Sequence, residues 1–133
     1  MNAADLVTCA LAVLPNAYAP YSRFRVAAAL LTADGRVFTG TNVENASYGL
    51  TLCAERVAAG AAVAAGSREF AAVAVVADGD AAATPCGACR QVLAEFGGPD
   101  MAVHLASAKT PERVRSFRLA ALLPEAFSLP PRG

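Results

Sequence analysis

Residues 52–96 read LCAERVAAGAAVAAGSREFAAVAVVADGDAAATPCGACRQVLAEF, and this stretch decides the fold. Its first part, residues 52–65, is rich in alanine, the best intrinsic helix former, and Gly66 ends that run. Residues 70–77 are a continuous apolar run with three valines, which is typical of a strand buried on both faces. Pro85 favours a helix start, so we expect a second helix through about residue 96. The stretch therefore predicts a helix–strand–helix unit.

The rest of the chain adds a helix, a hairpin and short strands. Apolar residues at helical spacing over 5–14, followed by Pro15, predict a helix. The short apolar segment 24–32 and the extended segment 36–41 flank the turn dipeptide Asp34-Gly35, so they predict a β-hairpin. This order of elements predicts an α/β sandwich that begins with a hairpin and links its later strands through helices. The remaining expected elements are strands at 101–106 and, less clearly marked, 114–117, and a helical turn at 119–123.

Length and composition limit the possible functions. The 133 residues fit one domain, spanning 1–133, and a hydrophobic content of 56% predicts a compact apolar interior. Eleven basic residues balance eleven acidic ones, so the net charge is zero. Nucleic-acid binding usually needs a basic surplus to neutralise phosphates. We therefore expect a small or locally charged ligand and no nucleic-acid partner.

The distribution of charges and cysteines indicates the cytoplasm and no contact with a membrane. The charge-free run from Leu6 to Ser22 is interrupted by polar residues and prolines, and a spanning helix needs about 20 mostly apolar residues. No basic stretch precedes this run, as a secretory signal would require. Four cysteines without such a signal favour a reduced state and use in metal binding or catalysis.

Three of the four cysteines stand at the expected helix starts. Cys53 begins the first helix of the unit, and Cys86 and Cys89 begin the second, three residues apart and so on one helix face. The free amides of a first helical turn lower thiol pKa values and favour the thiolate, which is the metal-binding form. The two helix starts meet at one sheet edge if the strand between them pairs parallel with its neighbours.

Three thiolates would hold one Zn²⁺ and leave its fourth position open, as in a catalytic zinc site. Glu55 lies about 200° round the helix from Cys53, so it would flank this open position and carry protons without binding the metal. Arg56 could donate to a thiolate sulfur and, with the two helix N-termini, offset the negative charge of the site.

Other interpretations of these residues remain at this point. The three cysteines could be unrelated, or Cys9 could complete a structural zinc site, although Cys9 is also typical of an ordinary buried thiol. His104, the only histidine, is expected to be a hydrogen-bonded strand residue without a function. A non-catalytic, zinc-stabilised binding module would need a fourth protein ligand and would leave Glu55 without a role.

Nearly the whole chain resembles the small, homotetrameric cytidine deaminases that act on free nucleosides. The resembling segments are YAPYSRF at 18–24, TNVENASY at 41–48, CAER at 53–56, PCGACRQ at 85–91 and LLPEAF at 122–127. The resemblance implies a three-layer α/β/α sandwich around a mixed five-stranded sheet. It also implies hydrolytic deamination of cytidine and 2′-deoxycytidine to uridine and 2′-deoxyuridine in pyrimidine salvage, with release of ammonia.

The same resemblance assigns roles at the metal centre. Cys53, Cys86 and Cys89 would bind one zinc ion per subunit, and Glu55 would be the proton shuttle. The nearest rival is a relative that acts on another aminopyrimidine, such as blasticidin S. A polynucleotide-editing deaminase fits the neutral charge and short length less well.

The resemblance also implies substrate contacts. Asn42 and Glu44 would bind the sugar, chiefly its 3′-hydroxyl, although they could simply be polar turn residues after a strand. Phe24 would stack on the pyrimidine, although a Phe that opens an apolar strand is often a core residue. Relatives commonly have glycine where this chain has Ala27, which could alter the pocket wall. The other implied substrate contacts are Ala54, Tyr48 near a subunit contact, and Phe127 reaching the base from a neighbouring subunit, unless Phe127 merely caps the core.

Overall fold

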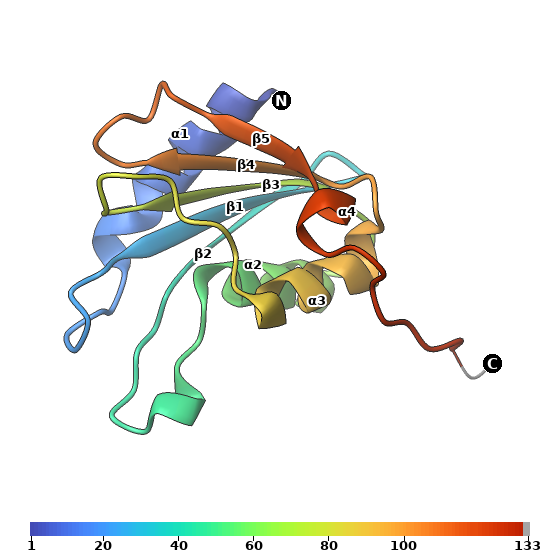
Figure 1. Cartoon of the computed structure of the whole chain (residues 1–133), viewed down its shortest axis with the longest axis horizontal. Helices are drawn as coiled ribbons and strands as arrows, with labels where there is room; N and C mark the ends of the chain where they lie inside the picture. Colours follow the sequence, from blue (N-terminus) through green and yellow to red (C-terminus); the bar gives the residue numbers. More distant parts are fainter. Residues whose placement is uncertain (132–133) are drawn as a thin grey trace.

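The computed structural model describes residues 1–131 (Figure 1). Each helix and strand expected from the sequence is present, with its bounds within a few residues of the expected ones. Within residues 1–131, no helix has the length and apolar character that crossing a membrane requires. The elements are α1 (Ala3–Val13), β1 (Val26–Thr32), β2 (Val37–Thr41), α2 (Ala54–Ala64), β3 (Phe70–Ala77), α3 (Gly87–Gly97), β4 (Ala102–Ser107), β5 (Arg115–Arg118) and α4 (Leu119–Leu122).

The strands form one mixed sheet in the order β2-β1-β3-β4-β5. β3 and β4 are parallel, whereas the pairs β1–β2, β1–β3 and β4–β5 are antiparallel. The condition of parallel pairing for β3 is met on the β4 side only, because the first hairpin strand inserts on the other side. β1 is antiparallel to both β2 and β3, so β2 and β3 run in the same direction. Because α2 follows β2 and α3 follows β3, both helices still begin at the same edge of the sheet.

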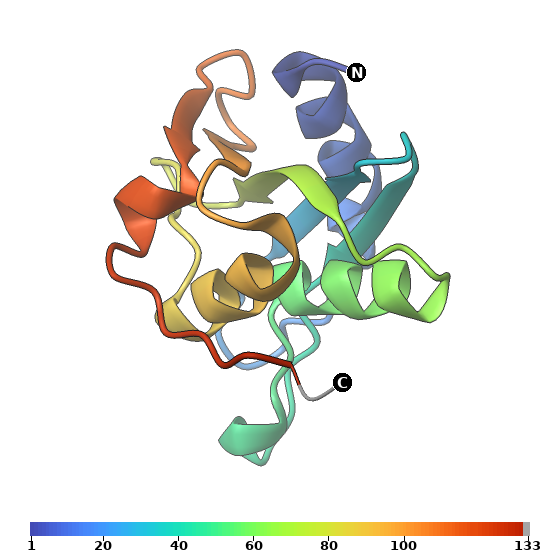
Figure 2. The same ribbon diagram turned by 90° about the vertical axis from the view of Figure 1, so that its right-hand side faces the viewer.

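Helices cover both faces of the sheet, which confirms the three-layer arrangement. Figure 2 shows α2 and α3 side by side on one face and α1 on the other. Side chains of β3 alternate between the two sides, as a strand buried on both faces requires. Val73 and Val75 belong to the core cluster that includes α2 and α3, whereas Ala74 and Val76 pack with α1.

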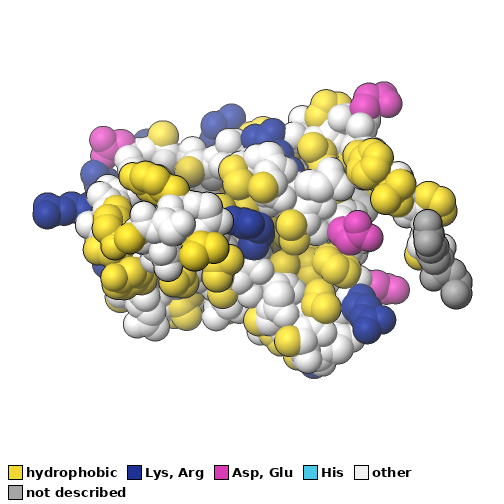
Figure 3. Space-filling model, turned by 90° about the horizontal axis from the view of Figure 1, so that it is seen from below, with side chains coloured by type: hydrophobic (Ala, Val, Ile, Leu, Met, Phe, Trp, Pro, Cys, Tyr) yellow, Lys and Arg dark blue, Asp and Glu magenta, His cyan; other side chains and the backbone are white. Residues whose placement is uncertain are grey.

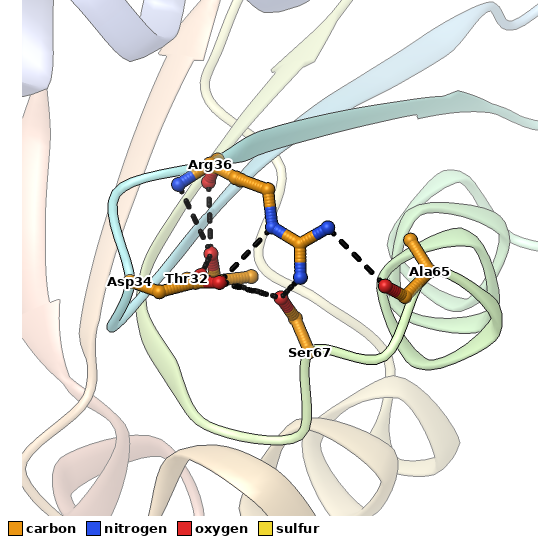
Figure 4. Close-up of polar contacts among 5 residues, drawn as sticks. All are labelled: Thr32, Asp34, Arg36, Ala65 and Ser67. Carbon is orange, nitrogen blue, oxygen red and sulfur yellow. Dashed lines mark hydrogen bonds and ion pairs between the residues drawn. The ribbon is translucent and has the colours of Figure 1, made fainter.

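A polar cluster fixes the end of α2 that lies away from the cysteines (Figure 4). Arg36, which follows the hairpin turn, donates from Nε to Asp34 at 3.0 Å and from Nη1 to the carbonyl oxygen of Ala65 at 3.2 Å. It also donates to the hydroxyl of Ser67, and Thr32 donates to Asp34. The hydrogen bond from Thr32 and those from Arg36 and Ser67 lower the pKa of Asp34. The cluster joins the β1–β2 hairpin to the loop between α2 and β3.

Candidate metal centre and active site

Three cysteines from two helix starts meet at one edge of the sheet. Cys53 is the N-cap of α2, Cys86 is the N-cap of α3, and Cys89 lies in the first turn of α3. The Sγ atoms of Cys53 and Cys86 are 3.9 Å apart, those of Cys86 and Cys89 are 3.3 Å apart, and all three lie within 4.8 Å of one another. A tetrahedral zinc ion with Zn–S bonds of about 2.3 Å holds its sulfurs about 3.8 Å apart. The three-cysteine cluster therefore fits a zinc ion.

The fourth cysteine and the histidine do not belong to this cluster. In the part of the chain that the structure describes, the three cysteines are the one group of three or more potential ligands. Cys9 packs with the α1-side core, so the sheet separates it from the cluster. The alternative of a structural site completed by Cys9 is therefore wrong. His104 Nδ1 lies 2.7 Å from Ser116 Oγ on β5, which confirms a hydrogen-bonded strand histidine.

Burial and neighbouring groups shift the ionisation of the cluster's thiols in different directions. Burial raises the pKa of the Cys89 thiol, and the charge of Glu55 raises it further. Burial acts the same way on Cys86, but hydrogen bonds from Cys89 and Cys53 outweigh it and lower the pKa of Cys86. A divalent cation stabilises all three thiolates. Arg56 Nη2 lies 3.7 Å from Cys53 Sγ, so a positive charge stands beside the cluster.

Glu55 occupies the second position of α2 and is only 5% exposed. Burial raises the pKa of its carboxyl group, and hydrogen bonds from its own backbone N–H and from the Cys89 thiol act in the opposite direction. A raised pKa means that the carboxyl group holds a proton more readily than an exposed carboxylate does. The structure therefore places a buried carboxyl group beside the three-cysteine cluster.

A cavity of about 220 Å³ is lined by Glu55 and by two cysteines of the cluster, Cys53 and Cys86. Val26 and Val75 of the sheet form its apolar wall. Its volume is below the roughly 300–1,000 Å³ of pockets for drug-sized ligands, so it suits one small ring. The other lining residues are Asn42, Thr51, Leu52, Ala54, Ala83 and Thr84.

Comparisons with known proteins agree with this geometry. Residues 1–105 match the family described as the cytidine and deoxycytidylate deaminase zinc-binding region. The chain belongs to this family. A cytidine deaminase of Halalkalibacterium halodurans is 47% identical over 128 residues, which cover 96% of each chain. One of Mycobacterium tuberculosis is 50% identical over 114 residues, covering 86% of this chain and 80% of that one.

Solved structures of the family share the fold. A crystal structure of cytidine deaminase from Burkholderia pseudomallei superimposes with a TM-score of 0.89 at 51% sequence identity. The alignment covers 96% of this chain and 100% of that chain. This chain is therefore an enzyme of the cytidine deaminase family, its cofactor is zinc, and the three-cysteine cluster can hold that ion.

The expected sugar-binding side chains hold the loop before β1. Asn42 is buried and lines the cavity; its Nδ2 donates to the carbonyl oxygen of Phe24 at 2.8 Å, and its Oδ1 accepts from the N–H of Val26 at 3.0 Å. The carboxylate of Glu44 accepts from the backbone N–H groups of Tyr21 at 2.9 Å and Ser22 at 3.1 Å, and from the Ser22 hydroxyl. These bonds lower the pKa of Glu44, the largest effect coming from the Ser22 hydroxyl. Asn42 thus connects the cavity wall to this loop, whereas Glu44 holds the loop without lining the cavity.

The aromatic candidates lie outside the cavity of the single chain. Phe24 does not line it, and the ring atom Cζ lies 3.7 Å from where a β-carbon would stand at Gly79. Tyr48 is 84% exposed, and Phe127 is 68% exposed, with its carbonyl oxygen accepting from Gln91 Nε2 at 3.0 Å. Of the expected substrate contacts, the structure brings only Asn42 and Ala54 to the cavity wall together with Glu55.

Two observations correct or extend the sequence analysis. Ala27 packs in the core cluster on the α1 side, whereas Val26 lines the cavity, so any effect of Ala27 on the pocket wall would act through the backbone. Successive side chains of a strand point to opposite faces, which places the extra methyl group on the far side of the sheet. The sequence analysis missed Thr51 and Thr84 as cavity-lining residues, although both stand two residues before a cysteine of the cluster.

We expect loss of one cysteine to abolish tight zinc binding. Loss of a residue that only hydrogen-bonds to a metal ligand lowers metal affinity about 10–100-fold. Cys53→Ser removes a ligand itself, so it should weaken zinc binding at least about 100-fold. Competition with a chromophoric chelator measures this change. Cys9→Ser is the matched control, because Cys9 lies on the other face of the sheet, and it should bind zinc like the wild type. Equal affinities for the two variants would contradict the three-cysteine site.

Proposed function

We propose that this enzyme hydrolytically deaminates cytidine and 2′-deoxycytidine to uridine and 2′-deoxyuridine, releasing ammonia. The observation that carries the proposal is the buried carboxyl group of Glu55 in the same small cavity as Cys53 and Cys86. Curated relatives of 47–50% identity that carry the name cytidine deaminase support the choice of base.

The reaction needs a nucleophile and a carrier for protons. Zinc held by Cys53, Cys86 and Cys89 would lower the pKa of a water molecule, which would supply the nucleophile for attack at C4 of the pyrimidine. Glu55 takes the proton that this water loses and delivers it to N3, which makes C4 more electrophilic. The Glu55 carboxylate next takes the second proton from the hydroxyl group now on C4 and donates it to the amino group, so the C–N bond breaks, ammonia leaves and C4 becomes a carbonyl carbon. Burial suits Glu55 for this work because its raised pKa favours return of the proton.

The charge balance also supports the proposal. Three thiolates around a divalent cation carry a net charge of −1, which opposes ionisation of a water molecule. The N-termini of α2 and α3 each contribute about half a positive charge, and Arg56 stands 3.7 Å from Cys53 Sγ. These groups return the site to neutral or positive charge, and a water pKa near 7 becomes accessible.

The nucleoside sugar is the proposed ligand of Asn42 and Glu44. Each side chain keeps hydrogen-bonding capacity beyond the bonds to the loop, because an amide has two N–H groups and a carboxylate accepts about four hydrogen bonds. We assign the Asn42 and Glu44 side chains chiefly to the 3′-hydroxyl, which ribose and 2′-deoxyribose share. Phe24 is the proposed stacking partner of the pyrimidine, and Ala54 contributes to the cavity wall beside the base.

A homotetramer with active sites shared between subunits is the proposed assembly. Tyr48 and Phe127 are exposed and lie away from the cavity of their own chain, which suits contacts with a neighbouring subunit. Figure 3 shows hydrophobic side chains in several groups on the face that carries α2 and α3, and more of them along the C-terminal segment. Large exposed apolar areas are typical of interfaces.

The cytoplasm and pyrimidine salvage are the proposed setting. Thiolate ligands must stay reduced when zinc is not bound, and the cytoplasm is a reducing compartment. The proposed products, uridine and 2′-deoxyuridine, are free nucleosides that nucleotide synthesis can reuse.

Glu55→Gln should retain zinc and lose nearly all turnover. A positioned proton carrier contributes about 10²–10⁴-fold, and the amide cannot exchange protons. The fall in cytidine absorbance measures kcat, and metal analysis confirms the zinc content. Glu69→Gln changes an exposed carboxyl group before β3 and should behave like the wild type. Turnover by Glu55→Gln within tenfold of the wild type would refute the assigned role.

The sugar assignment predicts a specificity order. Cytidine and 2′-deoxycytidine should have similar kcat/KM values, and free cytosine should be at least about 100-fold poorer, because binding energy from the sugar supports the reaction at C4. Asn42→Ala should reduce this difference by lowering kcat/KM for the nucleosides more than for cytosine. Equal kcat/KM values for all three compounds with the wild-type enzyme would leave Asn42 and Glu44 without the proposed role.

Shared active sites predict complementation between two inactive variants. Co-expression of Glu55→Gln with Phe127→Ala should restore up to about a quarter of wild-type activity, because random mixing creates some sites with both residues intact. Co-expression of Glu55→Gln with the double variant Glu55→Gln/Phe127→Ala is the control, since no site then has Glu55. Absence of recovery from two assembled variants would show that Phe127 does not act in a neighbouring site.

A further inference from the structure

The contact between β2 and the start of α2 leaves no room for a side chain at Gly40. We propose that Gly40 is a positioning residue, whose missing side chain sets how closely the first turn of α2 approaches the sheet. Through that turn Gly40 places Cys53 and Glu55 relative to the cysteines of α3. The inference rests on the proposed function only for its activity measurement.

The geometry at Gly40 shows why no larger residue fits. A β-carbon there would lie 2.5 Å from the carbonyl oxygen of Ala54, 2.6 Å from the nitrogen of Ala58 and 3.0 Å from Cβ of Val57. Real β-carbons essentially never lie within 3.0 Å of such atoms. The backbone at Gly40 does not adopt a positive φ, so the requirement for glycine is one of space alone.

The opposing atoms cannot move aside individually. Ala54 and Ala58 are four residues apart, so their carbonyl oxygen and N–H group are the partners of one helical hydrogen bond. A flexible side chain could rotate away from a new methyl group, but this backbone pair could not. Both alanines are fully buried and belong to the same core cluster as Ala28, which pairs with Gly40 across the hairpin. A side chain at Gly40 must therefore displace the whole first turn of α2.

This turn carries the chemistry of the site. Cys53 caps it and Glu55 is its second residue, whereas Cys86 and Cys89 belong to α3. Ordinary contacts begin at 3.4 Å, so a methyl group at Gly40 would push the turn by about 1 Å. Such a displacement would change the 3.9 Å separation of the Cys53 and Cys86 sulfurs and the direction of the carboxyl group. A misplacement of about 1 Å can cost on the order of 100-fold in rate.

The same helix offers a matched control. Gly60 lies in the middle of α2, is exposed, and has nothing within 4 Å of the place where a β-carbon would stand. Alanine has a higher helix propensity than glycine, so Gly60→Ala should raise the thermal midpoint by a few degrees and leave the site alone. The two variants introduce the same methyl group, one against the first turn and one into solvent.

The test compares Gly40→Ala, Gly60→Ala and the double variant, each loaded with cobalt(II) for spectroscopy and with zinc for kinetics. We expect Gly40→Ala to lower kcat for cytidine about 10–100-fold with a smaller change in KM. We also expect shifted and weaker cobalt absorption bands, which report the arrangement of the three sulfurs. Gly60→Ala should keep the wild-type spectrum and kcat. The double variant repeats the test in a background with a more stable helix.

The following results would overturn either the role of Gly40 or the proposed function. A kcat within twofold of the wild type together with an unchanged cobalt spectrum would overturn the proposal. So would failure of Gly40→Ala to fold in both backgrounds, because Gly40 would then be required for folding and not for placing the site. A wild-type protein that does not deaminate cytidine would refute the proposed function instead, and the cobalt spectra would still decide the role of Gly40.

Discussion

The convergence of two helix N-termini on one point at the sheet edge is the constraint on which the site depends. β2 and β3 run in the same direction, so the helices that follow them begin together and deliver Cys53, Cys86 and Cys89 to within 4.8 Å of one another. The exposed amides at these helix starts supply positive potential where thiolates gather. The strand order therefore brings the cysteines together at the point where the helix N-termini stabilise their thiolates.

The arrangement separates binding from proton transfer within a few residues. Cys53 stands outside the helix as its cap, whereas Glu55, two residues later, is inside the first turn and turns toward the cavity. Burial, which disfavours the charged carboxylate, raises the pKa of Glu55. One helical turn thus presents a cysteine of the cluster and a buried carboxyl group in different directions.

The sequence predicted local features well and relative positions less well. The apolar runs and turn residues predicted the α-helices and strands, which depend on short-range periodicity. The cluster was predicted because Cys53, Cys86 and Cys89 stand at the starts of two successive helices. The insertion of β1 beside β3 and the direction of Ala27 depend on pairing between distant segments, which spacing does not encode. The close contact at Gly40 could not be predicted either, because it involves a glycine in one element and the backbone of another.

The spacing of the cluster along the chain has a thermodynamic consequence. Cys53 and Cys86 are 33 positions apart, so an ion that binds both closes a long loop and acts as a cross-link. A cross-link of this kind restricts the denatured ensemble, and the cost of closing the loop rises only slowly with its length. Because the ligands come together only in the native protein, the free energy of metal binding is also free energy of folding. The supply of the metal ion in the cell would then determine the lifetime of the folded protein as well as its catalytic rate.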